Sequence, residues 1–103
     1  MAVFTVLYPA RDGAKFDLDY NEATHIPLDK AAFADTGLES VQVLKGVAAP
    51  GGGPALYVAI ALLTFRDTEA LAASLGGPRA AEVMGDVANF TDIQPIAQVS
   101  EAR

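Results

Sequence analysis

The chain has 103 residues, a formal net charge of −6, no cysteine and a single histidine, His25. The acidic excess disfavours nucleic acid and anionic membranes as partners, and the absence of cysteine excludes disulfides, thiolate catalysis and cysteine-held metals. This length is usual for one domain, so we expect a single domain over residues 1–103. One histidine cannot form a histidine-rich centre, and we expect no metal and no cofactor.

The N-terminal segment predicts a strand rather than a targeting signal. Met1–Phe4 has no basic leader, and the longest apolar run, Ala55–Leu63, is too short to span a bilayer, so we expect a cytoplasmic protein. Val3–Tyr8 is rich in β-branched and aromatic residues and apolar on both faces, which is typical of a central strand.

A helix is expected next, with Asp17 as its N-cap and Leu18 as its first residue. Pro27 removes a backbone donor, so we expect a kink or break near His25 before the helix resumes over residues 28–34. The segment carries the only histidine of the chain and therefore draws attention as a site.

Two strands joined by a glycine-rich loop follow. Leu38–Val47 contains several polar side chains, which favours the edge of a sheet. The loop 48–54 lacks the Gly-Lys-Ser/Thr pattern and leads into a strand, which excludes a phosphate loop. Leu56–Phe65 is apolar at nearly every position, as expected of a central strand covered on both faces.

The remaining elements are two helices and a last strand. Asp67 is predicted to cap the first helix, and Pro78–Met84 is predicted to form a second one closed by Gly85. Thr91–Ser100 is predicted to be a strand, and Pro95 within it places that strand at an edge because proline cannot donate to a ladder.

The order of elements, βαββαβ, predicts an α+β, ferredoxin-like fold with a four-stranded antiparallel sheet. Helices can cover only one face of this sheet, while both central strands are apolar on the second face as well. An exposed apolar patch of several hundred Å², at about 25 cal/mol per Å², favours association. We therefore expect a homodimer in which two sheets face each other as a dimeric α+β barrel.

Three residues are candidates for catalysis. His25 suits general acid–base work because imidazole titrates near neutral pH, and Tyr20 lies in the same helical segment. Asp92 is expected to orient the histidine or a substrate hydroxyl, whereas Asp86 is interpreted as an ordinary turn residue. The alternative for His25 is a structural role, bonded to a carbonyl that the proline break frees.

Aromatic side chains form a second group of candidates, because they can line a pocket for a flat, apolar ligand. The alternative is that they simply belong to the core. The predicted substrate-binding residues are Tyr8, Tyr57, Phe65 and Phe90.

Four stretches of the chain together resemble the EthD family, named for ethyl tert-butyl ether degradation, within the dimeric α+β-barrel superfamily. The stretches are Leu7-Tyr8-Pro9, Phe16 to Leu28 with its Tyr20 and His25-Ile26-Pro27-Leu28, Tyr57-Val58-Ala59, and Met84-Gly85-Asp86 to Pro95. The resemblance implies the fold and the dimer predicted above. It also implies that His25 is the family histidine and Asp92 the family acidic position.

The resemblance leaves two classes of function open. The first is an enzyme that uses His25 for cofactor-free proton transfer, isomerisation, cyclisation or monooxygenation of a small aromatic or polyketide-like metabolite. The second is a non-catalytic binding or auxiliary protein of a degradation pathway. Family members are also labelled as reductases, which ranks third because no dinucleotide motif is present.

Overall fold

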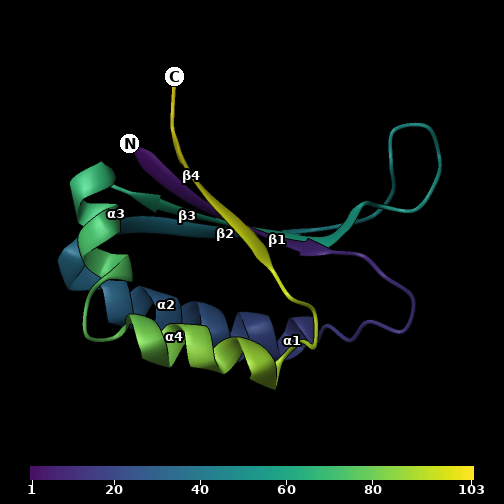
Figure 1. The fold of residues 1–103 in the computed structure, drawn as a ribbon, viewed down its shortest axis with the longest axis horizontal. Coiled ribbons are helices and arrows are strands. Elements are labelled where there is room, and N and C mark those ends of the chain that lie inside the picture. Colours follow the sequence, from purple (N-terminus) through teal and green to yellow (C-terminus); the bar gives the residue numbers. More distant parts are fainter.

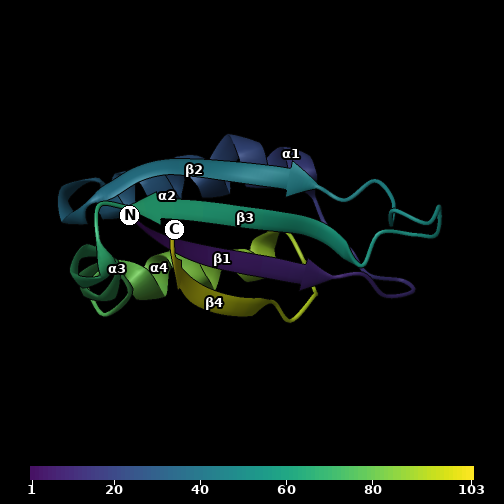
Figure 2. The ribbon, with the colours of Figure 1, turned by 90° about the horizontal axis from the view of Figure 1, so that it is seen from above.

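The computed structural model describes residues 1–103, and four strands form one antiparallel sheet in it. The strands lie in the order β2-β3-β1-β4 (Figure 2). This order confirms the ferredoxin-like prediction, with the first and third strands central and the others at the edges. The strands are β1 (Ala2–Pro9), β2 (Leu38–Lys45), β3 (Tyr57–Phe65) and β4 (Ile96–Glu101).

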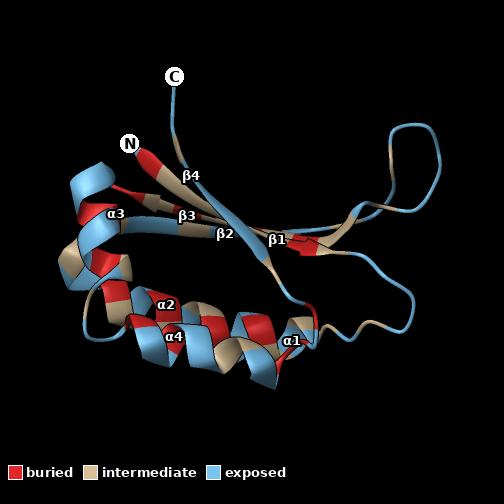
Figure 3. Ribbon diagram, in the orientation of Figure 1, coloured by how far each residue is buried: buried red, intermediate tan, exposed pale blue.

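All helices lie on one face of the sheet, as Figure 1 shows. Buried and exposed residues alternate along these helices (Figure 3). None of them is long and apolar enough to cross a membrane. The helices are α1 (Leu18–Tyr20), a π-helical turn (Asn21–His25), α2 (Ile26–Phe33), α3 (Thr68–Leu75) and α4 (Ala80–Asp86), with 3₁₀ turns at Ala34–Thr36 and Val87–Asn89.

Both predicted N-caps are present. The Asp17 side chain accepts a hydrogen bond from the Tyr20 backbone N–H at 3.0 Å, and Asp67 accepts one from Ala70 at 2.8 Å. The first helical segment ends where Gly37 adopts a left-handed conformation, with φ 102°. A side chain there would meet the Cβ of Ala70 at 2.6 Å, so the close approach of α3 also requires glycine.

The sequence predicted a kink or break near His25, and the break is wrong, because the helix continues past Pro27. The chain instead widens into a π-helical turn over Asn21–His25, in which the Ile26 N–H donates to the Asn21 carbonyl, five residues back. A wider turn is one way to accommodate a proline, whose ring would otherwise clash with the carbonyl four residues earlier. The π turn therefore leads directly into α2, which contains Pro27.

Two boundaries near the C-terminus also differ from the predictions. Gly85 does not close the helix, because its φ is not positive and α4 continues to Asp86. The last strand begins at Ile96, immediately after Pro95, so the proline lies outside the ladder. Residues 91–95 instead cross from the helix layer to the sheet, and Thr91 makes only an isolated bridge to Phe16.

The second face of the sheet has no helix against it. One cross-strand row on this face is entirely apolar: Leu7 pairs with Ile60 and Ile96, and Ile60 also pairs with Leu44. The two edge members are the most open, with Ile96 54% and Leu44 42% exposed. The predicted second apolar surface is therefore limited to one end of the sheet, because Thr5 pairs with Gln98 and Thr64 pairs with Ser40 in the rows beyond it.

Candidate functional site

A cavity lies between the sheet and the helices, with a volume of about 140 Å³. Eleven of its 15 lining residues are hydrophobic, so its walls are mostly apolar. Strand β1 contributes Phe4, Val6 and Tyr8. The lining residues Met84 of α4 and Ala97 of β4 are exposed, which places the mouth of the cavity between these two elements.

The polar wall of the cavity comes from one helical face. Asn21, His25 and Asp29 are spaced four residues apart, and all three are buried and line the cavity. In a regular α-helix this spacing drifts around the axis, since the helix has 3.6 residues per turn. In the wider π turn each residue advances by a smaller angle about the helix axis, which keeps the three side chains on the sheet-facing side.

Asp86 holds His25 in position. Its carboxylate accepts hydrogen bonds from the Tyr20 hydroxyl at 2.7 Å and from the Asn89 amide at 2.9 Å. The second oxygen lies 2.9 Å from His25 Nδ1. Because α4 continues through Gly85, Asp86 is still part of the helix, and its side chain reaches His25 in the π turn.

The protonation of this group follows from its hydrogen bonds. Burial raises the pKa of Asp86, but the bonds from Asn89, Tyr20 and His25 outweigh that effect and the net pKa is lowered. An ionised carboxylate only accepts, so His25 Nδ1 carries the proton that it shares with Asp86. In the neutral imidazole, Nε2 is then the nitrogen with a free lone pair.

Asp29 behaves in the opposite way. Burial raises its pKa most, the charge of His25 lowers it, the charge of Asp86 raises it, and the net pKa is about 6. Its Oδ1 lies 3.7 Å from His25 Nε2, which is too long for a hydrogen bond. The Asp29 Oδ1 and the Asn21 Oδ1 are both buried without a hydrogen-bond partner in the chain.

An aromatic cluster supports the histidine. The Phe90 ring centroid lies 4.7 Å from that of His25, and Phe90 also contacts Tyr8, Phe16 and Tyr20. Phe90 is buried and does not line this cavity, and it packs against the imidazole ring. Such aromatic packing limits the rotation of the ring between its two carboxylate neighbours.

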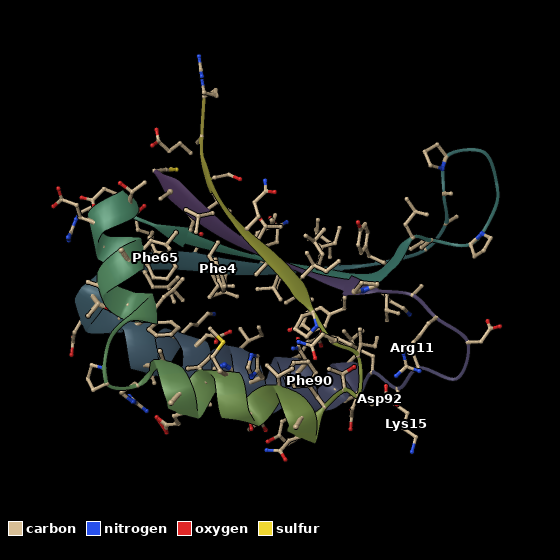
Figure 4. All side chains as sticks on the ribbon, in the orientation of Figure 1. Phe4, Arg11, Lys15, Phe65, Phe90 and Asp92 are labelled. Atoms are coloured by element: carbon tan, nitrogen blue, oxygen red, sulfur yellow. The ribbon has the colours of Figure 1, made fainter.

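Asp92 does not meet His25. Its carboxylate forms an ion pair with Arg11 at 3.1 Å and accepts a bond from the Lys15 backbone N–H at 2.9 Å, at the exposed end of the fold (Figure 4). The Lys15 bond, followed by Arg11, lowers the pKa of Asp92. The aspartate that forms a hydrogen bond with the histidine is Asp86, which sequence reasoning had interpreted as a turn residue.

The four predicted substrate-binding aromatic residues separate in space. Tyr8 lines the cavity, and burial followed by the charge of Asp29 raises its pKa. Phe65 is fully buried in the core, with its ring centroid 6.0 Å from that of Phe33. Tyr57 lines a separate surface pocket near the 46–55 loop.

Sequence reasoning missed Asn21, Asp29 and Asn89 and assigned Asp86 to a turn. The spacing of His25 and Asp29 by four residues was the available signal, since it places two titratable groups on one helical face. No periodicity could have shown that this face is the buried one, because polar residues at helical spacing normally face solvent.

Comparison with known proteins relates the whole chain to one family. A family model described as the EthD domain matches residues 13–94. The crystal structure of an EthD-like protein from Ralstonia eutropha JMP134 is 35% identical with a TM-score of 0.88, and covers 97% of this chain and 89% of that one. None of the curated proteins matches the chain.

More distant structures share the fold. An ethyl tert-butyl ether degradation (EthD) family protein from Bacillus halodurans C-125 has a TM-score of 0.79 at 19% identity, covering 100% of this chain and 99% of that one. SnoaB, a cofactor-independent oxygenase from Streptomyces nogalater, has a TM-score of 0.67 at 13% identity, covering 99% and 92%. At these identities the likeness concerns the fold alone.

Proposed function

The chain belongs to the EthD family, and on that premise we propose that it is an enzyme that moves protons on a small aromatic or polyketide-like metabolite without a cofactor. The observation that carries the proposal is the orientation of His25. Its Nδ1 is bonded to Asp86, and its Nε2 is left without a hydrogen bond at the wall of an apolar cavity. A histidine held by a carboxylate in this way is a typical general base.

The proposed step is an isomerisation. Nε2 of His25 takes a proton from an acidic C–H of the substrate, and the Asp86 carboxylate stabilises the resulting imidazolium. The same nitrogen returns the proton to another carbon of the resulting enolate, so that no oxidant or reductant is consumed. The apolar walls strengthen both electrostatic interactions because they exclude water from the reacting groups.

The volume of the cavity limits the substrate. An apolar cavity of roughly 150 Å³ holds one benzene-sized molecule, and the cavity here has about 140 Å³. A single ring is therefore the part of a metabolite that fits beside His25. Larger polyketide-like molecules would extend through the mouth between Met84 and Ala97.

The test is the conversion of cyclohex-3-enone to its conjugated isomer, followed by ultraviolet absorbance. We expect the wild-type protein to accelerate this conversion and His25→Gln to reduce the acceleration by about 100-fold or more. Glu22→Gln, an exposed change in the same helical turn, should match the wild type. Equal rates for wild type and His25→Gln would refute the proposal, as would inactivity of the wild type on this ketone and on single-ring quinols with oxygen.

We further propose that the protein is a homodimer that buries the open face of its sheet. The apolar row of Leu44, Ile60, Leu7 and Ile96 supports this assembly, because a second copy presents an equally apolar surface. Sedimentation velocity should give the mass of a dimer for the wild type and of a monomer for Ile96→Glu. A folded wild-type monomer at micromolar concentration would contradict the proposal.

A non-catalytic binding protein is the second candidate. The burial of His25 favours it, since the side chain is only 7% exposed and packs against Phe90 as a core residue would. In that case both the wild type and His25→Gln should bind the ligand, and neither protein should catalyse proton transfer. Ligand binding and turnover measured on the same variants separate the two functions.

A further inference from the structure

We propose that the cavity selects a single-ring ligand that carries a hydroxyl group of the phenol or enol type, and that Asp29 accepts the hydrogen bond of that hydroxyl. The inference rests on the proposed function in so far as it names the ligand of the same cavity. It concerns recognition, however, and can be tested without turnover. It also gives a role to a buried carboxylate that proton transfer by His25 does not use.

The unpaired oxygen of Asp29 is the main observation. The side chain is only 3% exposed, and its Oδ1 has no hydrogen-bond partner within the chain. A buried polar atom without a partner carries a substantial desolvation cost, so native proteins rarely keep one without a reason. Asp29 lines the cavity, although its Oδ1 is itself closed to solvent beside His25 Nε2, so a rotation of the carboxylate is needed to bring that oxygen to a donor on a ligand.

A second unpaired oxygen lies on the same wall. Asn21 is one helical turn from His25, is 2% exposed, and has an Oδ1 without a partner. The rest of the lining is mostly hydrophobic. One polar wall facing apolar walls matches a ring with a hydroxyl on one edge, and does not match an unsubstituted hydrocarbon.

The groups that face Asp29 are His25 from the π turn, Asp86 from α4 and Tyr8 from β1. Burial and the charge of Asp86 raise the pKa of Asp29, His25 lowers it, and the resulting value is about 6. Above that pH the carboxylate is charged and only accepts hydrogen bonds. A ligand hydroxyl that stays neutral up to about pH 10, as that of tyrosine does, then donates to it.

Phenol and toluene are the matched probes, because they differ only by a hydroxyl in place of a methyl group. We expect wild-type protein at pH 8 to bind phenol at least about tenfold more tightly than toluene, measured by calorimetry. Asp29→Asn should reduce this preference to about threefold or less. Asp35→Asn, an exposed change just beyond α2, should leave the preference as it is in the wild type.

A second measurement needs no variant. Lowering the pH from 8 to 5 protonates Asp29, which weakens the bond to phenol and removes the cost of covering a charge with toluene. The preference for phenol in the wild type should therefore fall as the pH passes through about 6. Asp29→Asn retains His25, Asp86 and Tyr8, so the absence of this pH dependence in the variant assigns it to Asp29.

Either of two results overturns the inference: equal affinities for phenol and toluene in the wild type, or an unchanged preference in folded Asp29→Asn protein. The outcome is separable from that of the proposed function. If the phenol preference depends on Asp29 while His25→Gln isomerises ketones as fast as the wild type, the ligand assignment stands and the catalytic proposal fails. If the phenol preference does not depend on Asp29 while His25→Gln loses the isomerisation activity, the ligand assignment fails and the catalytic proposal stands.

Discussion

The two ends of the space between sheet and helices are built differently. At the end nearest α3, Ala2, Phe65 and Leu71 are buried among other apolar side chains and leave no polar atom unpaired. At the other end, Asn21 and Asp29 are equally buried and have unpaired oxygens beside a cavity. The first arrangement stabilises the fold and the second costs stability, which is the pattern expected where function has determined the residues.

The largest effect is expected at the packed end. Phe65→Ala removes a fully buried ring and should lower the free energy of unfolding by about 3–5 kcal/mol, because the surroundings collapse only partly around the cavity. Urea unfolding at pH 7 measures this loss. Phe65→Leu keeps most of the volume and should lose far less, and a loss for Phe65→Ala below about 1 kcal/mol would show that this end is not closely packed.

Asp29→Asn should raise the free energy of unfolding, whereas Phe65→Ala lowers it. The pKa of Asp29 rises from about 3.9 in the unfolded chain to about 6 in the fold. Stability is therefore lost as the pH rises from about 4 to 6, and the loss is complete above pH 6. The variant should be more stable than the wild type at pH 8 by up to about 3 kcal/mol.

This advantage of Asp29→Asn should shrink toward zero as the pH falls to 4, which urea unfolding across the pH range measures. Asp35→Asn serves as the exposed control. An Asp29→Asn protein less stable than the wild type at pH 8 would mean that other groups of the chain stabilise the charged Asp29 carboxylate.

Asp86→Asn distinguishes the two aspartates near the C-terminus. The amide donates to His25 Nδ1, which favours the wrong tautomer and should reduce ketone isomerisation by about 100-fold or more. Stability should fall by about 1–3 kcal/mol because buried partners lose a charged acceptor. Asp92→Asn should leave the isomerisation rate unchanged, and a comparable loss in that variant would return the catalytic role to Asp92.

The smallest effect is expected for Arg11→Gln. Its ion pair with Asp92 is exposed on both sides, with side chains 51% and 47% accessible. Water and salt screen such a pair, so the urea midpoint should not change measurably in 0.5 M sodium chloride. A clear shift of the midpoint would show that the loop before Asp17 depends on this contact.

The sequence predicted the elements near the sheet more accurately than those near the site. The apolar character of both faces of Val3–Tyr8 and Leu56–Phe65 placed both strands at the centre, and the polar residues of Leu38–Val47 placed that strand at an edge. The last strand is also at an edge, although Pro95, from which this was predicted, lies outside it. The motifs from Leu7 to Pro95 identified the EthD family, which the family match confirms. The predictions of element boundaries that failed, at Pro27, Gly85 and the start of the last strand, all concern positions where glycine or proline was expected to end or continue an element.

The amino-acid sequence by itself determined the order of strands and helices, the apolar face of the sheet that meets the helices and the presence of a single histidine. These properties depend on neighbours along the chain, which periodicity and capping residues record. Only the tertiary structure decided which carboxylates meet that histidine. Asp86 lies 61 residues from His25 in the chain, and the contact depends on a π turn in one helix and on the extra length of another, which no local pattern encodes.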